Sequence, residues 1–324
     1  MHTRKLSRRQ ALARTGLLVG TAVAGQKFAA TAQAAAPAAP SNGRTNRPFR
    51  FCLNTATIRG QKLGIVEEIE IAAKAGYDGI EPWVEAIDAY VKGGGSLKDL
   101  RKRVADHGLV VESAIGFPEW IVDDDARRAK GLERAKRELD LVAQIGGRRF
   151  AAPPAGATDV PGLNLRRATE RYRTLLEAGE QVGVVVQLEL WGFSKNLNHL
   201  GECVGVAVDT GHPKACVLAD VFHLHKGGSD FRGLSLLGPN TVQVLHMNDY
   251  PADPPREKID DSFRVYPGDG TAPLGELLRT LHGTGGTKVL SLEVFNQQYW
   301  AQDALGVART GLEKMKTVVA RVKV

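Results

Sequence analysis

From residue 49 onward, short apolar runs alternate with longer segments in which apolar residues recur at helical spacing. Short apolar runs bounded by turn residues are typical of buried parallel strands, and the longer segments are typical of helices packed on such a sheet. We predict eight strands, at residues 49–54, 79–83, 110–115, 149–152, 184–190, 215–219, 242–246 and 289–294. We predict eight helices, at residues 64–75, 96–107, 124–145, 164–182, 197–208, 229–237, 273–282 and 301–321.

Glycines separate several predicted helices from the strands that follow, as at Gly76 and Gly183. Glycine is favoured there because a helix commonly ends in a left-handed residue. Eight alternating units, without a GxGxxG turn after the first strand, favour a closed barrel over an open doubly wound sheet. The prediction is therefore an α/β protein with a (β/α)₈ TIM barrel, formed as a single domain by residues 49–324.

The first 36 residues differ in composition from the rest of the chain. Basic residues precede an apolar stretch at residues 15–24, and no acidic residue occurs before Glu67. The SRRQAL segment at residues 7–12 resembles a twin-arginine export signal. We predict a twin-arginine signal peptide at residues 1–36, with a disordered basic tail or an uncleaved anchor as alternatives. Residues 37–48 are predicted to form a flexible linker.

The predicted signal implies that the protein interacts with the twin-arginine export machinery and works in the periplasm or outside the cell. It also accounts for most of the positive charge. The formal net charge is +7, and removing residues 1–36 takes away six basic and no acidic residues, which leaves +1. A chain with so little net charge is not expected to bind nucleic acid.

The three cysteines, Cys52, Cys203 and Cys216, are far apart in the sequence and include no CxxC pair. This spacing argues against a disulfide framework and against a structural zinc site. We interpret all three as small buried apolar residues.

Polar residues with metal-binding side chains end four consecutive predicted strands. They are Glu189, Asp220, His246 and Glu293. In a parallel barrel the carboxyl ends of the strands meet at one mouth, where we expect these side chains to converge. Three carboxylates buried together need a cation, and three oxygen ligands with one nitrogen suit Mn²⁺ or Mg²⁺, with Co²⁺ or Zn²⁺ as alternatives. The prediction is therefore a centre for one divalent metal ion.

A second pair of residues has the same spacing as Asp220 and His223. Asp209 and His212 repeat the DxxH pattern, but residues 197–208 are predicted to be a helix. Asp209 would then lie at a helix end on the opposite rim of the barrel, so Asp220 is the preferred ligand.

Five segments carry a family resemblance: LEL at 188–190, DVFHL at 220–224 followed by GG at 227–228, HMNDY at 246–250, YPGDG at 266–270 and LEV at 292–294. In these segments the chain resembles the xylose-isomerase-like superfamily of sugar isomerases and epimerases, which also contains abasic-site endonucleases and inosose dehydratases. The resemblance extends over the chain after the linker. It implies a TIM barrel with Glu189, Asp220, His246 and Glu293 as metal ligands, and His223 near the substrate.

Our hypothesis is a metal-dependent isomerase or epimerase. The metal would bridge two neighbouring oxygens of a keto or aldehydo sugar, and Glu189 and Glu293 would act as base and acid around a cis-enediolate. Export favours a substrate without phosphate. A dehydratase or lyase acting on a keto-glycoside or cyclitol is an alternative, and a non-catalytic sugar-binding protein is another. An abasic-site endonuclease is disfavoured because the second and third strands lack histidine.

Other residues near the predicted strand ends are candidates for binding a carbohydrate substrate. Glu81 and Glu112 are candidates for binding its hydroxyls. His223 either orients a hydroxyl or hydrogen-bonds a carboxylate, and Arg264 meets either an anionic group or a neighbouring acid. Aromatic rings either stack on the sugar or pack in the interior, at Trp83, Trp120 and Trp191. A homo-oligomer is compatible with the sequence.

Overall fold

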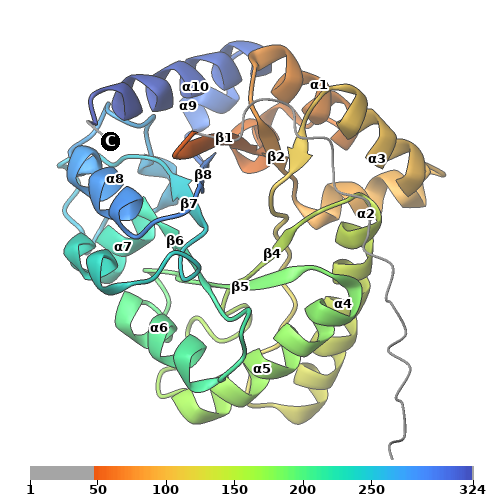
Figure 1. Ribbon diagram of the computed structural model, residues 1–324, viewed down its shortest axis with the longest axis vertical. Coiled ribbons are helices and arrows are strands. Elements are labelled where there is room, and N and C mark those ends of the chain that lie inside the picture. Colours follow the sequence, from red (N-terminus) through yellow and green to blue (C-terminus); the bar gives the residue numbers. More distant parts are fainter. Residues whose placement is uncertain (1–46, 323–324) are drawn as a thin grey trace, which may run out of the picture. The chain divides into compact units, whose positions relative to one another are not determined.

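The computed structural model of the protein describes residues 47–322, which form a barrel of parallel strands inside a ring of helices (Figure 1). The strands pair in the order β3-β2-β1-β8-β7-β6-β5-β4. They are β1 (Phe49–Asn54), β2 (Gly79–Glu81), β3 (Val110–Val111), β4 (Arg149–Ala152), β5 (Val185–Glu189), β6 (Val217–Asp220), β7 (Val244–Met247) and β8 (Lys288–Leu292). The predicted signal peptide, and the linker before residue 47, lie outside the described residues.

The helices that cover the strands fall mostly where the apolar periodicity predicts them. The α-helices are α1 (Ile65–Ala75), α2 (Val84–Lys92), α3 (Leu97–Asp106), α4 (Asp125–Gln144), α5 (Leu165–Val182), α6 (Leu200–Asp209), α7 (Val221–Gly227), α8 (Leu274–Gly283), α9 (Gln297–Trp300) and α10 (Ala304–Ala320). The 3₁₀ segments are η1 (Thr55–Gln61), η2 (Phe231–Leu236) and η3 (Asp261–Phe263). Within residues 47–322, none of these helices combines the length and apolar character needed to cross a bilayer.

The barrel closes between β3 and β4 through backbone hydrogen bonds rather than a regular ladder. Ala114 donates to the Arg149 carbonyl at 3.0 Å and accepts from the Ala151 amide at 2.8 Å, and the Arg148 amide donates to the Val111 carbonyl at 3.2 Å. The third strand is therefore shorter than predicted, since β3 contains only Val110 and Val111. Beyond it, Ile115 forms isolated bridges with Trp83 and Ala151. The predicted TIM-barrel fold is confirmed.

Two apolar layers hold the barrel together. A large cluster packs the outer faces of the strands against the helices. A smaller cluster fills the inside of the barrel beneath the carboxyl ends of the strands and consists of Cys52, Ile115, Ala151, Leu218, Val244 and Val289. The three cysteines are buried and free, as predicted. The inner layer excludes water from the barrel interior, so the polar side chains at the strand ends lie on a packed apolar layer.

One acidic side chain lies within the buried face of α1. Ile65, Ile69 and Ala72 form that face together with Glu68, whose side chain is only 5% exposed. One Glu68 carboxyl oxygen has no hydrogen-bond partner. Burial, with a smaller contribution from Glu67, raises the pKa of Glu68 from 4.5 to about 8. The folded protein therefore holds this carboxyl group neutral at physiological pH.

Glu68→Gln is expected to stabilise the protein above pH 5. The unfolded chain releases the Glu68 proton near pH 4.5, whereas the folded protein keeps it until about pH 8. Stability contributed at this site therefore falls as the pH rises through that window. We expect Glu68→Gln to remove this fall and to add about 1–3 kcal/mol at pH 8, since one pKa unit corresponds to about 1.4 kcal/mol. Urea unfolding at pH 5 and pH 8 measures the difference.

The exposed Glu133 on α4 provides the matched control, because Glu133→Gln changes the same group where water solvates it. Equal pH dependence of the free energy of unfolding in wild type and Glu68→Gln would contradict the interpretation.

Candidate metal centre

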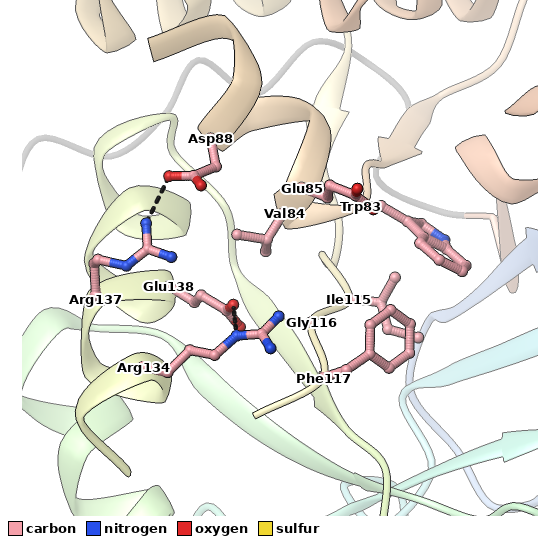
Figure 2. Close-up of a pocket in the computed structure, with 10 residues that line it drawn as sticks. All are labelled: Trp83, Val84, Glu85, Asp88, Ile115, Gly116, Phe117, Arg134, Arg137 and Glu138. Atoms are coloured by element: carbon pink, nitrogen blue, oxygen red, sulfur yellow. Dashed lines mark hydrogen bonds and ion pairs between the residues drawn. The ribbon is translucent and has the colours of Figure 1, made fainter. Parts of the chain in front are cut away.

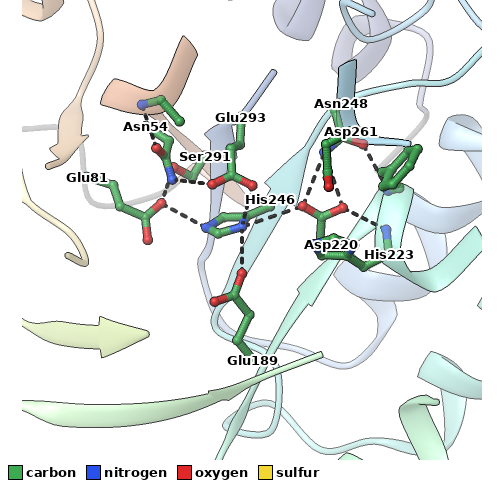
Figure 3. A network of polar contacts seen from close by, with 12 residues as sticks. Asn54, Glu81, Glu189, Asp220, His223, His246, Asn248, Asp261, Ser291 and Glu293 are labelled. Atoms are coloured by element: carbon green, nitrogen blue, oxygen red, sulfur yellow. Dashed lines mark hydrogen bonds and ion pairs between the residues drawn. The ribbon is translucent and has the colours of Figure 1, made fainter. Parts of the chain in front are cut away.

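His246 on β7 is fully buried and lies among four carboxylates (Figure 3). Its Nδ1 is 3.1 Å from Glu293 Oε2 and 3.6 Å from both Asp220 Oδ2 and Glu189 Oε1. Its Nε2 is 3.1 Å from Glu81 Oε2. The two ring nitrogens thus face different surroundings, with three acids on one side of the imidazole and one on the other.

The register of the parallel strands produces this arrangement. Asp220 pairs with His246 across β6 and β7, and His246 pairs with Ser291 across β7 and β8. Glu293 follows β8 two residues beyond Ser291, and residues two apart on an extended chain point to the same side. Asp220, His246 and Glu293 therefore all reach the barrel interior at its carboxyl end.

Asp220, His246 and Glu293 can hold a metal ion. Each offers one ligand atom, and these atoms lie within 4.8 Å of one another. His246 Nδ1 is buried without a hydrogen-bond partner, although carboxylates surround it. A divalent cation fits this donor set, since it would accept the imidazole lone pair and balance the clustered negative charge. Glu189, the fourth predicted ligand, is not part of this group, although its Oε1 lies 3.6 Å from His246 Nδ1.

Glu81 contacts the Nε2 side of His246, opposite the three acids that face Nδ1. Its Oε2 accepts a 2.6 Å hydrogen bond from the Ser291 hydroxyl and lies within hydrogen-bond distance of His246 Nε2. Burial would raise the pKa of Glu81, but the imidazole beside it lowers the pKa below its ordinary value. A carboxylate at Nε2 leaves Nδ1 as the ligand atom. The predicted contact of Glu81 with substrate hydroxyls is corrected: the side chain is fully buried against His246 and does not line the cavity above.

Arg264 meets neighbouring acids, which was one of its two predicted roles. Its Nη1 donates to Asp220 Oδ2 at 2.7 Å and to Glu293 Oε2 at 2.9 Å, and its Nε donates to Asp261 Oδ1 at 2.9 Å. Burial would raise the pKa of Asp220, but Arg264, His223 and His246 together outweigh burial and hold that pKa well below its ordinary value. The guanidinium therefore forms ion pairs with two of the candidate ligands, Asp220 and Glu293.

His223 lies beside this ion pair and lines the cavity. Burial lowers its pKa, although Asp220 opposes the shift, so the neutral ring is favoured. Arg264 Nη2 is 3.1 Å from His223 Nε2, and a guanidinium can only donate, so Nε2 accepts. The ring proton then belongs on Nδ1, which has no hydrogen-bond partner among the described residues. His223 is thereby left with a free donor.

An aromatic cavity opens above the acids. Its polar part is formed by Glu189, His223, Asp261, Arg264 and Glu293. Its rings are Trp83, Phe117, Trp191, Phe193 and Phe295. Aromatic faces beside a few fixed polar groups are typical of carbohydrate-binding sites. Trp83 and Trp191 are thus brought to the site, whereas Trp120 is buried in the interior and donates to the Pro153 carbonyl at 2.8 Å.

The structure does not bring Glu112 to this cavity. Glu112 forms ion pairs with Arg50 at 2.8 Å, Arg149 at 3.4 Å and Arg148 at 3.6 Å. Arg50 and Arg149 belong to the first residues of β1 and β4, so Glu112 lies toward the opposite end of the barrel. The predicted role of Glu112 in binding substrate is therefore corrected to a structural one.

The alternative to Asp220 also falls outside the site. Asp209 is the last residue of α6 and is exposed, and His212 lies 3.5 Å from Glu180 on α5. Asp220 ends β6 and is fully buried.

Sequence reasoning missed four residues that hold the acids in place. Asn54 donates to Glu293 Oε1 at 3.0 Å, and Asn248 donates to both oxygens of Asp220 at 3.3 Å. The Ser291 hydroxyl donates to Glu81 in the same way, whereas Asp261 accepts from Arg264, which itself donates to Asp220 and Glu293. Asn54 ends β1, so the strand-end rule used for the other strands identifies it; Asp261 lies in a loop with no comparable signal.

Together, the barrel and the Asp-His-Glu group at its carboxyl end define a TIM-barrel protein with a candidate divalent-metal centre. The sequence profile of the xylose isomerase-like TIM barrel family matches residues 69–318. The chain therefore belongs to the xylose isomerase-like TIM barrel family.

Similar proteins include two curated enzymes and a zinc-containing structure. Inosose isomerase of Halalkalibacterium halodurans is 25% identical over 287 residues, which cover 84% of this chain and 97% of that protein. The 3-dehydroshikimate dehydratase of Pseudomonas aeruginosa is 27% identical over 254 residues, covering 77% of this chain but only 39% of the dehydratase. The crystal structure of the IolI protein with a bound zinc atom has a TM-score of 0.78 and 22% identity, and the match covers 84% of this chain and 98% of IolI.

Glu81→Gln is expected to weaken Zn²⁺ binding about tenfold or more, because a neutral amide at Nε2 makes His246 a poorer ligand. Competition with a chromophoric chelator, added to metal-free protein, measures the affinity.

Asp209→Asn is the control and should bind Zn²⁺ as the wild type does. If Glu81→Gln also binds Zn²⁺ with unchanged affinity, Glu81 does not act through His246.

Proposed function

We propose that this protein is a divalent-metal-dependent isomerase or epimerase of a non-phosphorylated keto-sugar or cyclitol ketone. One observation carries the proposal: His246 Nδ1 lies 3.1–3.6 Å from three buried carboxylates, and two of these, Glu189 and Glu293, also line an aromatic cavity. The similarity to an inosose isomerase supports the same class of reaction.

Asp220, His246 and Glu293 would hold the metal, with Glu189 as a fourth ligand. Mn²⁺ or Mg²⁺ suits the three oxygens and one nitrogen, with Co²⁺ or Zn²⁺ as alternatives, and IolI binds zinc. When bound, the metal supplies Lewis-acid polarisation of the substrate carbonyl, which acidifies the neighbouring C–H.

Glu293 and Glu189 occupy environments suited to opposite roles. Both oxygens of Glu293 accept hydrogen bonds, from Asn54 at 3.0 Å and from Arg264 at 2.9 Å. Glu189 Oε2 has no partner, and burial raises the pKa of Glu189 well above its ordinary value, although His246 opposes this. Two carboxyl groups in such different surroundings are suited to act as base and acid.

Glu293 would take the proton from the carbon beside the carbonyl, which leaves an enediolate, and Glu189 would deliver a proton to it. Delivery to the former carbonyl carbon, with the hydroxyl proton passing to the former carbonyl oxygen, isomerises the substrate. Return of a proton to the original carbon from the opposite face epimerises it. The Nδ1–H of His223 would donate to a substrate hydroxyl, while Trp83 and Trp191 pack against the apolar face of the ring.

A dehydratase or lyase is the second candidate, supported by the similarity to a 3-dehydroshikimate dehydratase. The same proton abstraction would then be followed by loss of a β-hydroxyl or glycosidic group, with His223 donating a proton to the leaving oxygen.

We also propose that the protein is exported, on the basis of the twin-arginine pattern at residues 7–12. A site outside the cytoplasm favours free sugars over phosphorylated ones. The cavity agrees, since its cationic group, Arg264, is already paired with acids.

The test is hydrogen exchange in D₂O followed by NMR, with metal-loaded protein and a panel of free ketoses, inososes and 3-keto-glycosides. We expect deuterium to enter the carbon beside the carbonyl. Chelation should abolish exchange, and Glu293→Gln should slow it by about 10²–10⁴-fold, the usual contribution of a general base.

Asp209→Asn is the control and should exchange at the wild-type rate. Exchange with retention of all hydroxyls favours the isomerase or epimerase, and loss of a hydroxyl or glycosyl group favours the lyase. Binding of these sugars without exchange or turnover would identify a non-catalytic sugar-binding protein instead.

A further inference from the structure

A second cavity lies beside the aromatic one, between α2 and α4 (Figure 2). Trp83, Ile115 and Phe117 line both cavities. The rest of the second cavity is formed by α2, by residue 116 and by the middle of α4. The two cavities are therefore neighbours that share the part of their lining formed by these three residues.

The shared wall is tied to the metal centre. The rings of Trp83 and Phe117 meet edge to face, with centroids 4.9 Å apart. The Trp83 indole N–H donates to Asn54 Oδ1 at 3.2 Å, and the Asn54 amide donates to Glu293 Oε1 at 3.0 Å. A group that packs against Trp83 from the second cavity thus lies two hydrogen bonds from a candidate metal ligand.

The polar lining of the second cavity suits hydroxyl groups. It consists of three carboxylates and two guanidinium groups, from Glu85, Asp88, Arg134, Arg137 and Glu138. Carboxylates accept hydrogen bonds and guanidinium groups donate them, so alternating hydroxyls of a polyol find partners of both kinds. The excess of carboxylates disfavours a phosphate or carboxylate ligand. An uncharged, hydroxylated group fits this lining.

Glu138 supplies an unused acceptor in this cavity. Its side chain is only 2% exposed, and while Oε1 accepts a 2.6 Å hydrogen bond from Arg134 Nε, Oε2 has no partner. A Cβ atom at Gly116 would lie 2.2 Å from that oxygen, so the absence of a side chain there makes room for it. Figure 2 shows the Arg134 guanidinium pointing toward the Phe117 side of the cavity. Glu138 therefore keeps one carboxyl oxygen that no protein donor satisfies.

We propose that the cavity between α2 and α4 is a second carbohydrate subsite, which binds a hydroxylated substituent, a glycosyl or polyol group, of the ring processed at the metal centre. The proposal rests on the proposed function and narrows its substrate to a keto-glycoside longer than one sugar. Trp83 and Phe117 contact both parts of the substrate, Glu138 accepts from a hydroxyl of the substituent, and Arg134 donates to one.

The first test compares turnover of 3-keto-glucose and 3-keto-cellobiose by the metal-loaded full chain. We expect a higher kcat/KM for the disaccharide. Arg134→Met and Glu138→Gln should each lower the disaccharide-to-monosaccharide ratio of kcat/KM about tenfold, as expected for lost hydrogen bonds to a charged group. Arg127→Met is the matched control, since Arg127 lies on the same helix but pairs with the exposed Glu119. It should leave the ratio unchanged.

The second test needs no turnover. Saturation-transfer NMR with cellobiose and methyl glucoside on the wild type and on Arg134→Met reports binding directly. We expect stronger binding of cellobiose by the wild type, and loss of that preference in Arg134→Met but not in Arg127→Met.

The two tests separate this proposal from the proposed function. Turnover of 3-keto-glucose without any advantage for the disaccharide would overturn the second subsite and leave the function standing. A preference that survives both Arg134→Met and Glu138→Gln would also overturn it, since the substituent would then bind elsewhere. Cellobiose binding that depends on Arg134, with no turnover of any sugar, would support the subsite and reject the function.

Discussion

Four carboxylates approach one imidazole at the carboxyl end of this barrel, and their mutual repulsion is the constraint to which the surrounding structure responds. Two like charges about 4 Å apart repel by roughly 4 kcal/mol even at an effective dielectric constant of about 20. The chain offsets this with fixed donors: Arg264 between Asp220 and Glu293, and the amides of Asn54 and Asn248. The acids are thus held close together by neighbours that come from three different parts of the chain.

These donors also give the acids distinct properties. Glu293 and Asp220 are surrounded by hydrogen-bond donors and an arginine, whereas Glu189 faces the aromatic cavity with one oxygen unpaired. Glu81 lies on the far side of the imidazole and determines which ring nitrogen is left for a ligand. The chemistry proposed for the site depends as much on these differences as on the presence of carboxylates.

The barrel could be predicted from the sequence because every strand is an apolar run and most helices have a clear apolar period. Three helices were not predicted: α2, α7 and α9. Each is short and comes soon after a strand, so it has too few turns to show an apolar period. The segment predicted as a helix at residues 229–237 forms the 3₁₀ segment η2.

Strand-end reasoning brought Asp220, His246 and Glu293 together correctly, because β6, β7 and β8 pair in a simple register. It misplaced Glu112, since the staggered strands of a closed barrel place residues of different strands at different heights. Strand β3 is only two residues long, so Glu112 remains beside Arg50 and Arg149. Register and stagger are properties of the folded sheet and are not encoded in any single run of residues.

Asp220 has two tasks at once. Its Oδ1 accepts a hydrogen bond from the His223 amide at 2.9 Å and so caps the start of helix α7. Its Oδ2 accepts a hydrogen bond from Arg264 and faces His246. A genetic screen for loss of activity would therefore recover changes at this position for two unrelated reasons, a damaged helix and an altered centre. Glu189 begins no helix, so an allele at that position separates the chemistry of the protein from its folding.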